Sequence, residues 1–596
     1  MDAVCANTSG KFELQTQQKF LKKYTRNADK WDRLLLYHQI GSGKTCTAIT
    51  IAEQWIQDHP DYRVIVILPA RLRTNLIDEL VSPCGGEKYI DKETYDRYID
   101  PDTSEYHKKK IRAGFVKKIE EEYTILSFEK WKLLAGRAAN LKEWTKDMTT
   151  KTLVIVDEVH NLLSNTYDAK KYEEMLTTHK KSNAKGAATM LFKYMTRHAS
   201  NTCKMIFMTA TPIFDNIGQF KELTECLQKT AVPKRSTIAD VLPMLKGRVS
   251  YFPGTSPVAY PQVSYDMVEV PMSATQDRLT DIVMLENNDD YDDGKEAFMS
   301  KQRQIAVSCG RSPLSDMAEY CPKIKYAIDL IIKQKGSKHI VYSSFVKQGI
   351  ALVAAALEAQ GWVNIKDLGY NKDDVPESQQ YKVYAMWDGK TRDIEKQKIK
   401  ALANDRDNRF GKYVRVILGS PSMKEGVSFK HVQHMHILDP VWNVSAKDQV
   451  EGRAIRFCSH VDMPAAFRKV AVHLYKAVPK ADGEGAVART CDELIYNVIM
   501  PRKEADIRAA EHALRSIALD RDLFKGLYNS SDNTHENTGL HITRSKSVKD
   551  KASSCPKRRR PNPILNECPK SFPYTRDNPK GDPCCYKKEA RTNKSL

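Results

Sequence analysis

Short apolar runs recur along the first 230 residues of the chain, separated by helical or charged stretches. The runs lie at 34–37, 64–70, 124–128, 152–157 and 205–211. The run at 152–157 is apolar or β-branched without alternation, which is typical of strands buried on both faces of a sheet. Strands that alternate with helices predict a parallel sheet covered by helices. The predicted fold class is therefore α/β.

A second series of the same kind begins after residue 320. A helix is expected over 323–336, and strands are expected at 339–344, 414–420, 434–440 and 469–475. Between the two series the pattern loosens and includes an acidic run at 286–293, which indicates an exposed loop. The predicted organisation is a first domain at 1–230, an accessory insertion or linker at 231–320, a second domain at 321–480, a helical region at 481–540 and a basic tail at 541–596.

The segment HQIGSGKT at 38–45 lies between the first apolar run and the helical pattern CTAITIAEQW. In a strand–loop–helix unit of this kind, backbone N–H groups of the loop and the helix N-terminus favour phosphate oxygens. Lys44 would reach the β- and γ-phosphates of ATP, and the Thr45 hydroxyl would hold Mg²⁺. His38 replaces the glycine that usually opens this loop, so a Gly-rich turn without a ligand remains an alternative. The expected nucleotide contacts are Gly41, Ser42, Gly43, Lys44 and Thr45.

The segment VIVDEVH at 154–160 places two carboxylates at the end of an apolar run. Ligand sites of open parallel sheets lie where the strands end. Asp157 would complete the Mg²⁺ shell and Glu158 would polarise the attacking water. His160 would lie near the γ-phosphate. The alternative is a solvated strand end with no ligand.

Two further segments complete the set of candidate ATP-site motifs. QVEGRAIR at 449–456 spaces Arg453 and Arg456 three residues apart, so we expect them to share one helix face with Gln449 in the same frame. Arginines placed on the developing charge accelerate phosphoryl transfer by about 10³–10⁵. MTAT at 208–211 supplies Thr209 and Thr211, which would link the ATP site to the bound polymer. An exposed basic helix and ordinary strand-end capping are the respective alternatives.

These four segments, together with VYSSFVKQGI at 341–350, GSPSMKEGVSF at 419–429, HILDPVWN at 436–443 and EGRAIRFCSHVDMP at 451–464, carry a family resemblance. The chain resembles the superfamily 2 helicases of large nucleocytoplasmic DNA viruses, including the poxvirus nucleoside triphosphatase I and the small subunit of the poxvirus early transcription factor. The resemblance implies two RecA-like domains with ATP and Mg²⁺ bound in the cleft between them. LQTQQKFLKKY is similar to the segment before the loop in these proteins, so Gln18 is the candidate adenine contact, with Gln15 and Gln17 as other registers.

The same resemblance implies contacts with the sugar-phosphate backbone of DNA or RNA. Such contacts position a strand without reading its sequence. The candidates come from the segments PARLRTNL, SSF and GSPSMKEG, and exposed helix charge is the alternative for the two arginines. The candidate nucleic-acid residues are Arg71, Arg73, Ser343, Ser420, Glu425 and Gly426.

Composition narrows the class of protein and adds a basic tail. No apolar run approaches the roughly 18 residues needed to cross a bilayer, and the 13 cysteines are scattered, so we expect free thiols and no structural disulfides. The net charge is +19, and residues 541–596 contain 15 Lys and Arg against 5 Asp and Glu. This tail would bind nucleic acid or a partner, with a solvated tail or an import signal as alternatives. Zinc binding by its cysteines is left open: Cys555, Cys568, Cys584 and Cys585.

The function that we predict is an ATP-driven helicase or translocase on DNA or RNA. By resemblance it would act in viral transcription, with viral RNA polymerase or transcription factors as partners and no membrane, in the virion and the host cytoplasm; a nuclear phase stays open. The alternatives are a duplex DNA translocase without unwinding, a non-catalytic scaffold subunit of a transcription complex, and the motor of a nuclease. The scaffold alternative conflicts with the presence of all the ATP-site residues named above.

Overall fold

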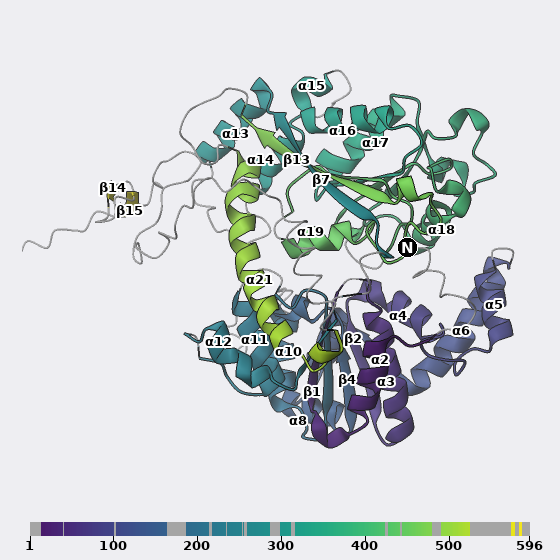
Figure 1. Cartoon of the computed structure of the whole chain (residues 1–596), viewed down its shortest axis with the longest axis vertical. Coiled ribbons are helices and arrows are strands. Elements are labelled where there is room, and N and C mark those ends of the chain that lie inside the picture. The colour runs from purple at the N-terminus through teal and green to yellow at the C-terminus, as the bar shows by residue number, and fades with distance from the viewer. Residues whose placement is uncertain are drawn as a thin grey trace, which may run out of the picture. The chain divides into compact units, whose positions relative to one another are not determined.

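The computed structural model describes residues 13–39, 41–100, 103–163, 186–213, 217–233, 235–252, 254, 259–286, 299–310, 316–423, 427–441, 444–479, 490–524, 574–577 and 583–586. The chain divides into two compact units (Figure 1). The first comprises Met1–Ala259 with Ala505–Thr534, and the second comprises Tyr260–Glu504 with His535–Leu596.

The first unit is built on a six-stranded sheet in the order β3-β2-β4-β5-β1-β6, and every neighbouring pair is parallel. The five predicted strands are present within a few residues of their expected positions, which confirms the α/β prediction. The strands are β1 Arg33–His38, β2 Arg63–Leu68, β3 Tyr123–Ser127, β4 Thr152–Val156, β5 Lys204–Thr209 and β6 Val249–Phe252.

Helices cover both faces of this sheet. Leu34 and Leu36 of β1 belong to one apolar cluster and Leu35 and Tyr37 to another, because successive side chains of a strand point to opposite faces. The helices of this part of the unit are α2 Thr16–Thr25, α3 Lys44–Asp58, α4 Arg73–Leu80, α5 Lys92–Ile99, α6 Glu105–Glu122, α7 Phe128–Ala135, α8 Leu141–Thr149, α10 Gly186–His198, α11 Ile217–Gln228 and α12 Ile238–Val241, with the 3₁₀ turns η3 Ala70–Leu72 and η4 Val159–Leu162.

The second unit contains a seven-stranded parallel sheet in the order β7-β13-β12-β8-β11-β10-β9. Its strands are β7 Gln262–Pro271, β8 His339–Tyr342, β9 Val363–Asn364, β10 Val383–Trp387, β11 Val416–Gly419, β12 His434–Ile437 and β13 Lys469–Val478. Its helices are α13 Ala274–Glu286, α14 Ser300–Val307, α15 Met317–Tyr320, α16 Pro322–Lys333, α17 Ala351–Glu358, α18 Asp393–Asn404, α19 Val444–Glu451 and α20 Cys491–Glu493. A short antiparallel pair in the tail comprises β14 Tyr574–Asp577 and β15 Pro583–Tyr586.

The stretch 231–320 differs from the accessory insertion or linker that we predicted. Its first part supplies β6, which pairs with β1, so the first unit extends to Ala259 rather than to residue 230. Its middle part supplies β7, which pairs with β13 along ten residues. β7 is an edge strand whose side chains are mostly exposed or half-buried, and β6 has only four residues, so neither produces a long apolar run.

The region after residue 480 also divides differently from the prediction. α21, Met500–Ser516, begins in the second unit, but from Ala505 onwards the chain belongs to the first unit. Ile507, Ala510 and Leu514 join the apolar cluster on one face of the first sheet. The 3₁₀ turn η14, Arg521–Phe524, then follows. The first unit is therefore made from two separate parts of the sequence.

The expectation of no structural disulfide was wrong. Cys46 of α3 and Cys84, four residues after α4, form a disulfide with their Cα atoms 5.4 Å apart. The two helices pack in one apolar cluster through residues such as Ile49, Leu76 and Ile77, which brings the two sulfurs together. Cys458 is disulfide-bonded as well. In the described part of the chain the free thiols are Cys203, Cys226, Cys309, Cys321 and Cys491.

No helix in the described ranges is both long and apolar enough to span a membrane. The side chains of the four tail cysteines that could bind zinc lie outside the described part of the structure. Within the described ranges, no group of three or more His, Cys, Asp or Glu side chains is arranged to hold a metal ion.

A ladder of four imidazoles lies across three neighbouring strands of the second sheet. Nδ1 of His339 on β8 lies 3.1 Å from Nε2 of His436 on β12, and Nδ1 of His434 lies 3.1 Å from Nε2 of His473 on β13. Burial lowers the pKa of His434 to about 4 and places those of His339 and His436 well below the usual value. The pKa of His473 is lowered by burial, although Asp266 opposes the shift. The ladder is therefore neutral at pH 7.

We expect the second sheet to lose stability as the pH falls below about 6.5. The unfolded imidazoles take up protons near that pH, whereas burial holds the pKa of each folded imidazole below its usual value, that of His434 at about 4, so acid favours the unfolded state. Each imidazole contributes a slope of at most about 1.4 kcal/mol per pH unit. Hydrogen exchange of peptides covering β12, corrected for the intrinsic rate, should show a weaker pH dependence in His434→Gln. The exposed His107→Gln is the control. If the corrected exchange rate of these peptides changes equally steeply with pH in both variants, the prediction is contradicted.

Candidate nucleotide site

The loop between β1 and α3 has the strand–loop–helix form that the sequence predicts. β1 ends at His38 and α3 begins at Lys44. Gly41 and Gly43 have φ angles of 77° and 75°, in the left-handed region that favours glycine. A Cβ at position 43 would lie 3.1 Å from Nε2 of Gln18, so a side chain would also crowd the neighbouring helix. The loop thus turns tightly onto the N-terminus of a fifteen-residue helix.

Glutamines of α2 hold this loop from one side. Gln18 Nε2 donates to the carbonyl oxygen of Gly43 at 3.3 Å, and Gln17 Nε2 donates to that of Ser42 at 3.5 Å. The Gln18 Oε1 accepts from the backbone N–H of Gln15 at 2.8 Å. Gln17 and Gln18 are both buried. Gln17 and Gln18 therefore contact the loop, whereas Gln15 bonds to these two glutamines, and a contact of Gln18 with adenine stays a prediction.

Asp157 and Glu158 follow β4 at the carboxyl edge of the sheet. The Asp157 N–H donates to the Ile67 oxygen at 2.9 Å, and its Oδ1 accepts from the Glu158 N–H at 2.9 Å. Glu158 has a φ of 49°, which is unusual for a residue with a side chain. Its Oε1 lies 4.0 Å from Nζ of Lys44, the first residue of α3. Glu158 of one motif thus lies near the lysine of the other, with Asp157 next to it in the chain.

His160 connects the end of β4 to the end of β5. Its Nδ1 lies 3.0 Å from Thr209 Oγ1 and 3.3 Å from Glu158 Oε2. The Thr211 N–H donates to the same Thr209 hydroxyl at 3.0 Å. Burial lowers the pKa of His160 to about 4, an effect that Glu158 opposes and Lys44 reinforces. A neutral imidazole therefore links the DEVH segment to the MTAT segment.

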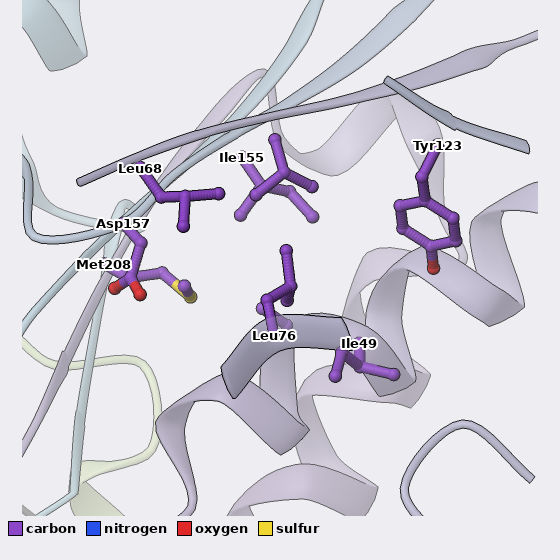
Figure 2. Close-up of a pocket in the computed structure, with 9 residues that line it drawn as sticks. Ile49, Leu68, Leu76, Tyr123, Ile155, Asp157 and Met208 are labelled. Atoms are coloured by element: carbon purple, nitrogen blue, oxygen red, sulfur yellow. The ribbon is translucent and has the colours of Figure 1, made fainter. Parts of the chain in front are cut away.

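A small apolar pocket lies behind Asp157 (Figure 2). Figure 2 shows Asp157 and Met208 at one end of the pocket, Leu76 and Ile155 in the middle and Tyr123 at the other end. Asp157 is the one ionisable carboxylate in this lining, so the pocket does not suit a polar ligand. Its apolar side chains therefore pack beside the Asp157 carboxylate. The remaining lining residues are Ala48, Ile49, Val66 and Leu68.

In the second unit, Gln449, Arg453 and Arg456 lie at and beyond the end of α19. Gln449 is within the helix, which ends at Glu451, so the prediction that both arginines share a helix face was wrong. A turn that begins at Gly452 takes over, because glycine is a weak helix former. Both side chains then bond to backbone oxygens. Arg453 Nη1 donates to Val427 at 2.8 Å and its Nε to Gln449 at 2.8 Å, and Arg456 Nε donates to Gly452 at 2.7 Å.

The candidate nucleic-acid residues lie in different environments. Ser343 is fully buried and its Oγ donates to Asp439 Oδ1 at 2.7 Å, while Ser420 is buried with its Oγ 3.1 Å from that of Ser422. These two side chains are therefore below the surface of the described structure, and their contact with a nucleic-acid strand stays a prediction. Arg71 is exposed in η3, and Arg73 pairs with Glu120 of α6 at 2.9 Å. Glu425 and Gly426 lie outside the described residues.

Asp439 and Asp520 accept hydrogen bonds that connect separate segments of the two sheets, and neither residue was assigned a role from the sequence. Asp439 follows β12 and accepts bonds from Ser343 Oγ and from the Ser344 N–H. Asp439 comes directly after an apolar run, as Asp157 does, so the same sequence signal could have identified it. Asp520 accepts bonds from β6 of the first unit. No local pattern indicates that contact, because it joins residues about 270 positions apart.

Two family models match this chain, one within each unit. Residues 11–214 match the family "Type III restriction enzyme, res subunit", and residues 322–458 match the family "Helicase conserved C-terminal domain". The solved SWI2/SNF2 ATPase core of Sulfolobus solfataricus in complex with dsDNA covers 85% of this chain and 97% of its own at 15% identity, with a TM-score of 0.29, which is too low to add to the fold assignment.

Several viral proteins are similar to the chain over most of its length. A protein of Acanthamoeba polyphaga mimivirus named as an ATP-dependent RNA helicase, R563, is 31% identical over 78% of this chain and 83% of its own. Helicase 087L of invertebrate iridescent virus 3 is 25% identical over 85% of this chain, which spans only 53% of that relative. The termination factor NPH-I homolog of African swine fever virus is 22% identical over 75% of this chain and 69% of its own. The chain belongs to the viral superfamily 2 helicases.

Proposed function

We propose that this protein is a DEVH-type, ATP-dependent motor on nucleic acid that acts in viral transcription. The observation that carries the proposal is the meeting of Lys44 and Glu158 beside Asp157 at the carboxyl edge of the first sheet. These are the residue types that bind the phosphates of ATP and polarise the attacking water.

The first step of the proposal concerns ATP and Mg²⁺. The loop 39–43 and the N-terminus of α3 would bind the phosphates, with Lys44 on the β- and γ-phosphates. The Thr45 hydroxyl and the Asp157 carboxylate are hard oxygen donors, which fit Mg²⁺. When bound, Mg²⁺ would bridge phosphate oxygens and neutralise part of their charge.

The second step concerns hydrolysis. Glu158 would orient the attacking water and accept its proton, and its neighbour His160 keeps the carboxylate in contact with a neutral imidazole. Arg453 and Arg456 are proposed to stabilise the developing charge on the transferred phosphoryl group, as arginine fingers do. Gln449 would assist them from the last turn of α19.

The third step concerns the polymer. Thr209 and Thr211 are proposed to transmit the state of the nucleotide to a strand of DNA or RNA, because Thr209 bonds to His160 and to the backbone of Thr211. Arg71 and Arg73 are proposed to contact phosphates of that strand. The names of the relatives include RNA helicases and a termination factor homolog, which supports a role in transcription, with polymerase or other transcription factors as partners. The virion and the host cytoplasm are the proposed sites of action.

Hydrolysis of ATP should be raised by one polymer and should depend on Lys44 and Glu158. We expect Lys44→Ala to lose nucleotide binding, and Glu158→Gln to retain binding but lose at least about 100-fold in rate, because a general base typically contributes 10²–10⁴-fold. The measurement is phosphate release with no polymer, single-stranded DNA, duplex DNA or single-stranded RNA.

The matched controls for this experiment are Lys118→Ala and Glu121→Gln on the exposed side of α6. Full stimulated hydrolysis by Glu158→Gln would contradict the assignment of the base. Salt-sensitive binding of polymer without hydrolysis by the wild type would favour the scaffold alternative.

Thr209→Val should weaken the link between hydrolysis and polymer. Valine keeps the shape of the side chain but removes the hydroxyl that bonds to His160 and accepts from Thr211, and a hydrogen bond is worth about 0.5–1.5 kcal/mol. Polymer-stimulated kcat should therefore fall by about three- to tenfold. The exposed Thr150→Val is the control, and an unchanged stimulated rate in Thr209→Val would show that the bond carries no coupling.

A further inference from the structure

The C-terminal part of α21 and the turn after it belong to the first unit and pack on its sheet. We call residues 505–524 the return segment. Its apolar residues Ile507, Ala510 and Leu514 pack in the core on one face, and the backbone N–H of Leu519 donates to the Val249 oxygen of β6 at 2.8 Å. Figure 1 shows the end of α21 beside this sheet. The segment therefore lies along the outer edge of β6, the last strand of the sheet.

Aromatic contacts continue from the return segment to the start of the nucleotide loop. The ring centroids of Phe524 and Phe252 are 5.1 Å apart, and those of Phe252 and His38 are 6.0 Å apart. The backbone N–H of Gln39, the first residue after β1, donates to the Phe252 oxygen at 3.0 Å. The position at which the loop leaves the sheet is thus set by β6, which the return segment covers.

A chain of buried hydrogen bonds runs parallel to these contacts. Asp520 Oδ1 accepts from the Tyr251 N–H at 2.8 Å, and its Oδ2 accepts from the hydroxyl of Ser250. The same hydroxyl oxygen lies 2.9 Å from His38 Nε2. His38, Ser250 and Asp520 are each fully buried, so water does not compete for these bonds. Burial raises the pKa of Asp520 to about 6, which leaves a carboxylate at pH 7.

The carboxylate fixes the direction of every proton in this chain. A carboxylate only accepts, so the Ser250 proton points to Asp520 and the Ser250 oxygen must accept from His38. His38 is therefore the tautomer with its proton on Nε2. Its Nδ1 is left as a buried acceptor with no hydrogen-bond partner among the described residues. Burial also lowers the pKa of His38 to about 3, so the imidazole is neutral.

We propose that Ser250 and Asp520 are positioning residues for the nucleotide loop, and that nucleotide affinity depends through them on the return segment. This inference rests on the proposed ATP site. The residue that they hold, His38, stands where related loops have glycine, and a large side chain at the base of the loop must be fixed if the loop is to keep one shape. The return segment lies beyond residues 322–458, where the second helicase-family match ends, so this chain completes its ATP site with sequence outside the matched domains.

The test is the affinity for a fluorescent ATP analogue, measured on the full chain without polymer. Ser250→Ala and Asp520→Ala should weaken binding by about tenfold, which corresponds to about 1.4 kcal/mol. Asp520→Asn should bind within about threefold of the wild type, since its amide can accept from Tyr251 and donate to Ser250. Leu523→Ala, an exposed residue of the same turn, is the matched control.

A spectroscopic readout separates positioning from simple packing. In Asp520→Asn the Ser250 hydroxyl must donate to His38, so the imidazole proton should move from Nε2 to Nδ1. Nitrogen NMR of ¹⁵N-histidine protein, with the His38 signal identified from His38→Gln, reports the tautomer directly. This measurement needs only Asp520→Asn, so it remains available if an alanine variant does not fold.

We call the hydrogen-bonded series Asp520–Ser250–His38 the relay, and the outcomes distinguish its failure from failure of the nucleotide site. Equal affinity in the wild type and in folded Ser250→Ala would overturn the relay alone. An unchanged His38 tautomer in Asp520→Asn, or a loss of affinity in that variant as large as in Asp520→Ala, would overturn it as well. Absence of nucleotide binding by the wild type would overturn the proposed function and the relay together.

Discussion

The parallel pairing of β5 between β4 and β1 is the constraint on which the candidate site depends. Parallel strands end at the same edge, so this order brings Asp157 and Glu158, Thr209, and the loop after His38 to one line. The three segments come from positions about 50 to 170 residues apart. Hydrogen bonds such as that between His160 and Thr209 then link segments that are far apart in the sequence.

Both sheets secure their carboxyl edges with buried polar contacts between neighbouring strands. In the first unit His160 bonds to Thr209 across β4 and β5. In the second unit Asp439 accepts from Ser343 across β12 and β8, with Arg303 Nη2 3.4 Å from its other oxygen. Loss of one partner leaves a buried polar group unsatisfied, at a cost of about 1–3 kcal/mol. The edges that carry the chemistry are therefore held in one arrangement.

Two features depend on residues that are distant in the sequence. The Cys46–Cys84 disulfide joins α3 to the turn after α4, directly beside the residues that open the nucleotide helix. The return segment adds its apolar side chains to the core of a unit that begins near the other end of the chain. In each case packing of an apolar face supplies the contact, and the covalent or hydrogen bond then fixes its geometry.

The sequence by itself determined the α/β class, five strands of the first sheet, four of the second and the identity of the candidate ATP residues, because buried parallel strands and phosphate loops have local patterns. It did not reveal β6 and β7, a short strand and an exposed edge strand, nor β9 and β10 at the other edge of the second sheet. It also placed Arg453 and Arg456 on a helix that ends before them. Only the tertiary structure decided the burial of Ser343, the Cys46–Cys84 pair and the contact of Asp520 with Ser250. Such contacts depend on the meeting of distant segments, which no local pattern encodes.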